Sequence, residues 1–177
     1  MTSNNTIYQL IDRLHELGNV ETGRGSKHPT SPNEELAQEI AHFLDTYTFL
    51  KKDQSYVDFL ESYAGLLLYR DEDFFSLGIF GFDEHVSMHL VEGEGELIDK
   101  EGILTFANLT LPSEEGEQSS DNLIGISFGF DATQQRTWGI YRNIDEQPYH
   151  WCWYCETFQE WLEKIVNCKG RLLEDGH

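Results

Sequence analysis

Two cysteines near the C-terminal end of the sequence have the spacing of metal and redox sites. Cys152 and Cys155 form a C-x-x-C pair, His150 precedes them, and Cys168 is the third cysteine. A structural zinc site needs four such ligands around a tetrahedron. On a strand over 149–154, however, Cys152 and Cys155 would point to opposite faces, and the sequence holds no second C-x-x-C pair. We therefore expect these cysteines to pack as small apolar side chains, without metal.

A redox role for the same pair is a second hypothesis, because a cysteine at a helix N-terminus has a lowered thiol pKa. A thioredoxin-like motif lies early in its domain, beside a β-α-β unit. Here only 22 residues follow Cys155, which is too few for the remainder of such a domain. The sequence therefore predicts no thiol chemistry at this position.

A second group of potential metal ligands consists of Asp83, His85 and His89. On a strand His85 and His89 share one face, but no further ligand stands close to them. We therefore favour a strand with ordinary polar side chains and keep a metal-dependent enzyme, built on these histidines or on the cysteines, as a minor alternative. The sequence contains no glycine-rich phosphate loop and no nucleophile elbow, so it predicts no catalytic residues and no cofactor.

Acidic residues are concentrated in two predicted turns. Paired carboxylates can carry out acid–base chemistry when apolar burial shifts one pKa, but the stretch VEGEGELIDKEG has the composition of a solvated hairpin tip. We expect the carboxylates of both turns to contact a partner instead. The candidate partner-binding residues are Asp71, Glu72 and Asp73 in one turn and Glu92, Glu94 and Glu96 in the other.

The overall charge points to the same kind of partner. Lysine and arginine total 12 and aspartate and glutamate total 32, which gives a net charge of −20. Residues 1–33 hold three basic and three acidic side chains, so the whole excess lies on residues 34–177. Such a surface repels nucleic acid and anionic membranes and attracts a basic protein, although acidity also serves solubility. The sequence does not indicate an oligomeric state.

Composition places the chain among cytoplasmic globular proteins. Aromatic residues make up 13% of the 177 residues, which argues against disorder of the whole chain. No apolar run is long enough to span a bilayer, and no signal peptide is predicted at the first residues. Three cysteines in the last 26 residues do not form a disulfide framework, so a reducing cytoplasm is expected.

Apolar spacing predicts four helices. The first spans about 7–17 and ends at Gly18, and the others begin near Ser31, Asp53 and Thr157. In the second helix Pro32 suits the first helical position and Glu34 completes a capping box with Ser31, and in the last helix Glu160 completes one with Thr157. Residues 19–32 are interpreted as a loop or linker, and Gly65 is expected to end the third helix.

Short runs rich in branched and aromatic residues predict the strands. These are expected near 66–69, 75–81, 87–91, 103–109, 123–129, 136–142 and 149–154. The last of them has large residues on both faces, so it is expected to be a central strand. Short connections favour antiparallel pairing. The predicted fold class is α+β, with an antiparallel or mixed sheet of about six strands and with the N-terminal helices and a C-terminal helix packed on it. We expect residues 1–33 to be an N-terminal helix and linker and residues 34–177 to be the α+β domain.

The order of these elements resembles the SUKH superfamily. YVDFLESYAG (56–65) is similar to the family helix that ends in an Asn-Gly-Gly turn, and LGIFGFDE (77–84) to the strand that follows. NLIGISFGFDATQQRTWGIYR (122–142) resembles its central hairpin, and ETFQEWLEKIV (156–166) its closing helix. The sequence departs from the pattern where Tyr63-Ala64-Gly65 replaces Asn-Gly-Gly and where an acidic insertion occupies 111–121.

The resemblance implies a non-catalytic protein without a cofactor. Bacterial SUKH proteins are mostly immunity proteins that bind polymorphic toxins, often nucleases or deaminases, and fungal relatives regulate cell-wall glucan synthesis as interaction hubs. We therefore expect an immunity protein that neutralises a basic toxin domain through an acidic surface. A regulatory scaffold of the cell-wall-regulator type is the alternative.

Overall fold

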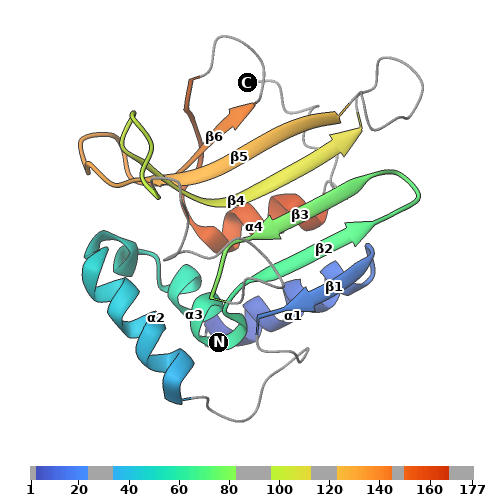
Figure 1. Ribbon diagram of the computed structural model, residues 1–177, viewed down its shortest axis with the longest axis horizontal. Helices are drawn as coiled ribbons and strands as arrows, with labels where there is room; N and C mark the ends of the chain where they lie inside the picture. Colours follow the sequence, from blue (N-terminus) through green and yellow to red (C-terminus); the bar gives the residue numbers. More distant parts are fainter. Residues whose placement is uncertain (1–2, 24–33, 83–96, 113–122, 145–149, 168–177) are drawn as a thin grey trace.

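The computed structural model describes residues 3–23, 34–82, 97–112, 123–144 and 150–167, and these form an α+β fold (Figure 1). The helices are α1 (Ser3–His15), α2 (Glu34–Thr46), the short 3-10 helix η1 (Thr48–Lys52), α3 (Gln54–Tyr63) and α4 (Phe158–Asn167). The strands are β1 (Asn19–Thr22), β2 (Leu66–Arg70), β3 (Phe75–Ile79), β4 (Ile103–Pro112), β5 (Leu123–Asp131), β6 (Ile140–Ile144) and β7 (Cys152–Cys155). None of the helices in the described ranges is long and apolar enough to cross a membrane.

The described strands form one sheet in which spatial order equals chain order, from β1 to β7. Each strand pairs with the next in the antiparallel sense, so the sheet has seven strands and is not mixed. β1 was not among the predicted strands, and the prediction of a loop at its residues is wrong. Its outward residues Asn19 and Glu21 are polar, and only Val20 and Thr22 face inward, so the apolar alternation is too short to stand out.

Three other strand predictions need correction or cannot be compared. β6 begins at Ile140 rather than 136, because the carboxylate of Asp131 organises a loop by accepting hydrogen bonds from the backbone N–H groups of Thr133 (3.0 Å) and Arg136 (2.8 Å). β7 is predicted to be a central strand but lies at the end of the described sheet, beside β6 only. The predicted strand at 87–91 lies outside the described residues.

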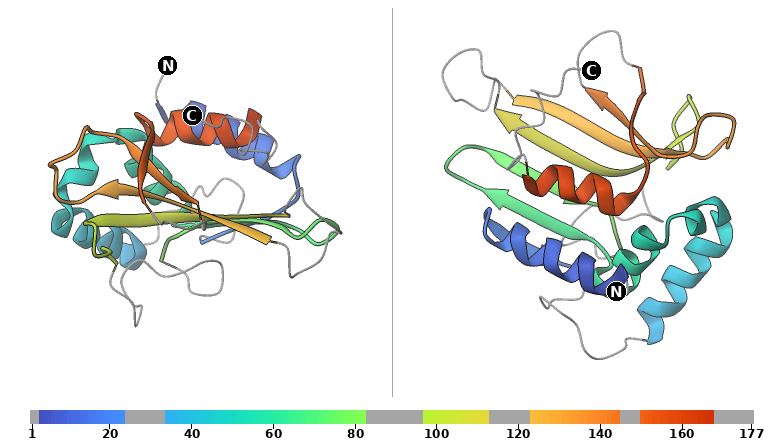
Figure 2. Two further views of the ribbon diagram at one scale, coloured as in Figure 1. Left: turned by 90° about the horizontal axis from the view of Figure 1, so that it is seen from above. Right: turned by 180° about the vertical axis from the view of Figure 1, so that it is seen from behind.

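Helices α1, α3 and α4 cover one face of the sheet, as the two views of Figure 2 show. The core between these layers is rich in aromatic rings. Trp161 of α4 packs edge-on against Phe106 of β4 (5.0 Å between ring centroids) and Phe128 of β5 (5.3 Å). Arg13 of α1 donates a hydrogen bond to the Asn167 side chain at 2.8 Å, so the first and last described helices also meet at the surface.

Asp53 joins two helices that are distant in the sequence. One carboxylate oxygen accepts hydrogen bonds from the backbone N–H of Tyr56 (3.3 Å) and the hydroxyl of Ser55 (2.5 Å), which caps α3. The other accepts the backbone N–H of Phe158 at 2.6 Å, and Ser55 accepts that of Gln159 at 2.9 Å. The N-terminus of α4 is therefore held by the cap of α3, in addition to its own cap at Thr157, which accepts the backbone N–H of Glu160 at 3.1 Å.

The end of α3 differs from the prediction. Ala64, rather than Gly65, is the first residue in the left-handed conformation, with φ of 54°. The segment at Gly81 approaches this turn closely, since a Cβ atom added to Gly81 would lie 1.8 Å from the carbonyl oxygen of Ala64. Phe82 donates its backbone N–H to the same oxygen at 2.9 Å. The turn is thus fixed by tertiary contacts, which outweigh the preference of glycine for this conformation.

Candidate protein-binding surface

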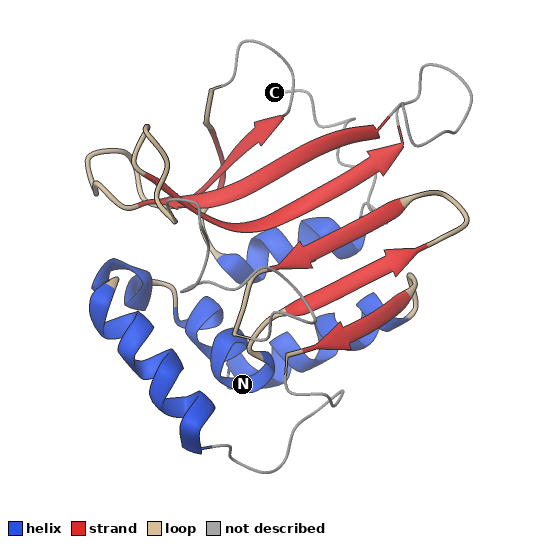
Figure 3. Cartoon of the chain, in the orientation of Figure 1, coloured by secondary structure: helices blue, strands red, loops and turns tan. Residues whose placement is uncertain are grey.

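The face of the sheet opposite α1, α3 and α4 carries small polar side chains. Along β3, β4 and β5 large apolar residues point to the helices, and the residues between them point the other way. The strand register places Gly78, Asn108, Ser127 and Asn143 side by side across four strands, and we call this set the polar row. No described helix crosses this face, which is the side seen in Figures 1 and 3.

The polar row consists of short residues, some of which carry hydrogen-bonding groups. Ser127 donates its hydroxyl to the Oδ1 atom of Asn108 at 2.9 Å. A Cβ atom placed on Gly78 would meet no other atom within 4 Å, so the space above this strand is open. A hollow of about 360 Å³ lies on the part of the row that crosses β4, β5 and β6. This arrangement allows a partner to approach the sheet closely and to hydrogen-bond with it.

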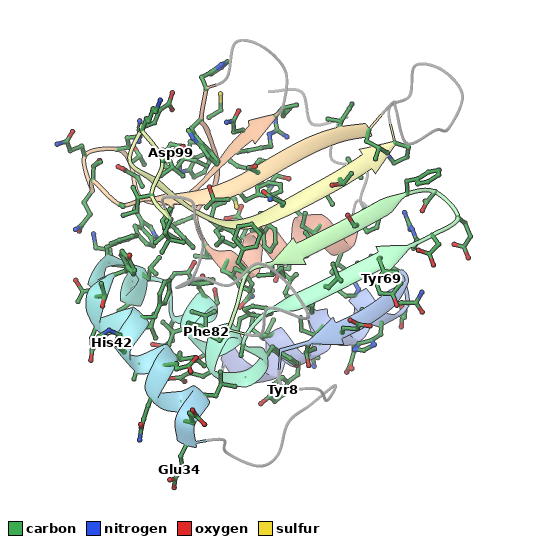
Figure 4. All side chains as sticks on the ribbon, viewed as in Figure 1. Tyr8, Glu34, His42, Tyr69, Phe82 and Asp99 are labelled. Carbon is green, nitrogen blue, oxygen red and sulfur yellow. The ribbon has the colours of Figure 1, made fainter. Side chains whose placement is uncertain are left out.

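Aromatic side chains flank the polar row. Trp153 of β7 pairs with Tyr141 of β6, and half of its surface is exposed. Its indole N–H donates to the carbonyl oxygen of Trp138 at 3.1 Å, which holds the ring in place. Tyr69 of β2 stands on the opposite flank, beyond β3 (Figure 4). Aromatic side chains are enriched in protein-binding surfaces.

Only part of the predicted acidic turn between β2 and β3 has carboxylates that a partner could contact. Asp71 and Glu72 are exposed. Asp73 is half-buried and forms an ion pair with Arg70, with 2.9 Å between Nη2 and Oδ2. Its charge is therefore largely compensated. The other predicted carboxylates, Glu92, Glu94 and Glu96, lie outside the described residues.

Helix α2 carries an acidic surface that the sequence analysis did not single out. Only Ile40, Phe43 and Leu44 of this helix are buried. The ring of Phe43 packs against the ring of Phe82, with 5.6 Å between the ring centroids. The outward side chains Glu34, Glu35, Glu39 and Asp45 are exposed, and Glu34 points away from the sheet in Figure 4. Asp45 is paired with Lys51 at 2.7 Å. The signal was present in the sequence, because none of the four carboxylates falls on the apolar stripe that Ile40, Phe43 and Leu44 form on the predicted helix.

Comparisons with protein-family models, curated proteins and solved structures find no match. The resemblance to the SUKH superfamily therefore stays a prediction, and the surfaces are interpreted from their own chemistry.

The two cysteines of the C-x-x-C pair lie in different environments. Cys152 is exposed, whereas Cys155 is fully buried and its thiol contacts the carbonyl oxygen of Thr157 at 3.7 Å. Burial and the nearby carboxylate of Glu160 raise the pKa of Cys155, which is opposite to the shift that a redox-active thiol needs. Within the described ranges no three histidine, cysteine, aspartate or glutamate side chains gather into a metal site. Cys168, Asp83, His85 and His89 lie outside those ranges.

This difference predicts the reactivity of the thiols. In a Cys168→Ser variant of the folded protein, a thiol reagent that produces a coloured product should modify Cys152 rapidly. Cys155 should react only after unfolding, because its sulfur is buried and its thiolate is disfavoured. A Cys152→Ser, Cys168→Ser double variant is the control and should show no rapid phase. Rapid modification of this double variant in the folded state would contradict the observed position of Cys155.

Proposed function

We propose that this protein is a non-catalytic protein-binding module, and that it acts as an immunity protein that neutralises a bacterial polymorphic toxin by binding it. The exposed carboxylates of α2 and of the β2–β3 turn are the observation that supports this proposal. They belong to a chain with a net charge of −20, all of it located after residue 33. A partner with a basic surface is complementary to this charge.

A nuclease toxin fits the proposed partner best. A nuclease holds the phosphates of its substrate with lysine and arginine, so an acidic protein can occupy the same groove in place of nucleic acid. The resemblance to SUKH immunity proteins supports the same role. Inhibition would then need no catalytic group on this chain, since occupancy of the toxin's substrate groove is sufficient.

One observation favours the second candidate function, a regulatory scaffold of the cell-wall-regulator type. The polar row contains glycine, serine and asparagine but no charged side chain. Such a surface is also suited to a neutral partner that is bound without being inhibited. The two functions differ in their effect on the partner, because only an immunity protein abolishes a toxic activity.

The decisive experiment is capture of the partner from the source cell, followed by an assay of its activity. We expect the captured protein to be a toxin domain, encoded beside this protein, whose activity is lost on stoichiometric binding. A partner that keeps its full activity in the complex would contradict the immunity proposal and favour the scaffold.

Salt dependence tests the electrostatic part of the proposal. Screening shortens to about 8 Å at physiological ionic strength, so the association rate with a basic partner should fall at least about tenfold between low and high salt. Replacing Glu34, Glu35 and Glu39 with glutamine should lower the association rate about threefold or more and change the dissociation rate by less than about twofold, as rim charges do. The matched Glu92, Glu94 and Glu96 triple variant tests the predicted second acidic turn in the same way. An association rate that is insensitive to salt would contradict the acidic surface, though not the immunity role.

A further inference from the structure

Exposed apolar side chains lie at one corner of the sheet, where the β2–β3 turn is beside the end of β4 and the start of β5 (Figures 1 and 2). In the described ranges three large apolar side chains are exposed, and two of them, Phe74 (43% exposed) and Leu123 (37%), belong to this corner. Leu123 pairs directly with Pro112. The β3–β4 register pairs Ser76 with Thr110, so Phe74 lies at the level of Pro112, two residues further on. We call Phe74, Pro112 and Leu123 the apolar patch.

The backbone of Phe74 is strained. Its φ is 55°, a left-handed conformation that a bulky residue rarely adopts, because its Cβ atom then comes too close to the backbone. Neither Phe74 nor Leu123 belongs to the described hydrophobic core or packs against it. Residues held in such conformations cluster at ligand clamps and binding sites. The Phe74 ring is therefore exposed at a cost to the fold, with no contribution to its core.

Acidic side chains stand beside the patch. Asp71 and Glu72 are exposed in the turn that leads to Phe74, and no described lysine or arginine forms an ion pair with either. The basic residue of this hairpin, Arg70, forms its ion pair with Asp73, with 2.9 Å between the two groups. The charge of Arg70 is therefore balanced by Asp73, and Asp71 and Glu72 leave a net negative charge next to the Phe74 ring.

The sequence on the other side of the patch is also acidic. Residues 113–122, which join Pro112 to Leu123, include four carboxylates and neither a basic nor a large apolar residue. They supply no apolar side chain that could cover the patch. A second copy of this chain is disfavoured as its occupant, because both copies carry a net charge of −20. A basic protein that exposes an apolar recess is complementary to the patch in both charge and polarity.

We propose that the apolar patch anchors the basic protein partner. This inference rests on the proposed function, because it assigns a contact to the same partner. Phe74 enters an apolar recess of the partner, and Asp71 and Glu72 face lysine or arginine side chains at the rim of that recess. A central apolar anchor with a polar rim is the usual arrangement of a protein interface. The next residue pair along β4 and β5, Thr110 with Gly125, lines the hollow of the polar row, so the partner extends from the patch onto that row.

The strained backbone provides a test that needs no partner. Phe74→Gly should lower the equilibrium constant of unfolding about threefold, because glycine adopts the left-handed conformation without the steric cost. Gln134→Gly is the matched control, since Gln134 is also exposed, has φ of 57° and lies beyond the opposite end of β5 from Leu123. It should be stabilised to a similar extent. Chemical denaturation measures both variants. A Phe74→Gly variant that is less stable than the wild type would show that the ring supports the fold, and would overturn the proposal.

Binding rates test the contact itself. The probe is the partner protein isolated with the wild-type chain, measured against full-length variants. Phe74→Gly should raise Kd about tenfold or more and Leu123→Ser about threefold, mainly through faster dissociation, as truncation of an anchor does. Gln134→Gly should leave Kd within about twofold, as an independent distant site does. Replacing Asp71 with asparagine and Glu72 with glutamine should instead slow association about threefold and change the dissociation rate by less than about twofold.

Unchanged affinity of both Phe74→Gly and Leu123→Ser would overturn the anchor, even if the partner loses its activity in the complex. A wild-type chain that sediments as a dimer, together with a monomeric Phe74→Gly variant, would assign the patch to a second copy and would also overturn it. Weaker binding of the patch variants to a partner that keeps its full activity would support the anchor and contradict the immunity proposal. Affinity and partner activity therefore test the two proposals separately.

Discussion

Replacing Trp161 with alanine should lower the free energy of unfolding by about 3–5 kcal/mol, the usual cost of removing a large buried aromatic ring. The Trp161 side chain is fully buried and contacts Phe106, Phe128 and Phe158 with centroid distances of 5.0, 5.3 and 5.3 Å. Its removal would leave a cavity where α4 meets the centre of the sheet. Chemical denaturation of the wild type and the variant measures the difference.

Two further variants test the contribution of the indole N–H group of Trp161 and of another residue in the same helix. The indole N–H of Trp161 has no hydrogen-bond partner among the described residues, so Trp161→Phe removes an unsatisfied donor and should cost less than the alanine variant. Glu163→Ala removes only the hydrogen bond that the Glu163 carboxylate accepts from the Gln159 side chain at 3.0 Å, and should change the free energy of unfolding by no more than about 1 kcal/mol. A Trp161→Ala cost below about 1 kcal/mol would contradict the observed packing of α4.

The second large effect is expected at Asp53. Asp53→Ala removes the cap of α3 and the acceptor for the backbone N–H of Phe158, which is left buried without its partner. Loss of a cap costs about 0.5–2 kcal/mol, and an unsatisfied buried donor costs about 1–3 kcal/mol, so the free energy of unfolding should fall by about 1.5–5 kcal/mol. Asp45→Ala, at an exposed aspartate in a surface ion pair, is the control and should leave the free energy of unfolding nearly unchanged.

The charge of Asp53 has a separate signature in the pH dependence. Burial raises the pKa of Asp53, although hydrogen bonds from Ser55, Phe158 and Tyr56 oppose the shift. The protonated carboxyl group therefore adds stability that is fully present below the ordinary pKa of 3.8 and is lost as the pH rises through the higher pKa of the folded protein. The wild type should lose free energy of unfolding relative to Asp53→Asn over this pH range. If the wild type instead gained free energy of unfolding relative to Asp53→Asn as the pH rose, the pKa shift would have the opposite direction.

Most of the fold could be predicted from local patterns. The helix predicted to begin near Thr157 is confirmed as α4, and its apolar residues Phe158, Trp161, Leu162 and Ile165 are all buried. The β5–β6 hairpin was also predicted, since polar residues separate two strongly apolar runs. β1 was missed because only two of its four residues face the core, and the position of β7 at the end of the sheet was missed because large residues on both faces suggested a central strand.

The candidate surface was harder to predict than the fold. The polar row comes from four strands, and no single strand shows that Gly78, Asn108, Ser127 and Asn143 are neighbours. Only the register brings them together, and register depends on pairings between distant residues. The acidic turn at 71–73 was located correctly. The ion pair between Arg70 and Asp73 was not predicted, because it depends on side-chain positions that the sequence does not show. The acidic side of α2 could have been found from the helical spacing alone.

The contact between Asp53 and Phe158 also affects how the chain folds during its synthesis. The two residues are 105 positions apart, so a growing chain can pair β1 to β4 in order before α4 has been synthesised. Until then Phe106 and Phe128 have no Trp161 ring against them, and the cap at Asp53 holds only one helix. An exposed aromatic surface of this kind is a target for chaperones and aggregation. Protection of the nascent chain therefore becomes complete only after α4 has been synthesised and has closed the core.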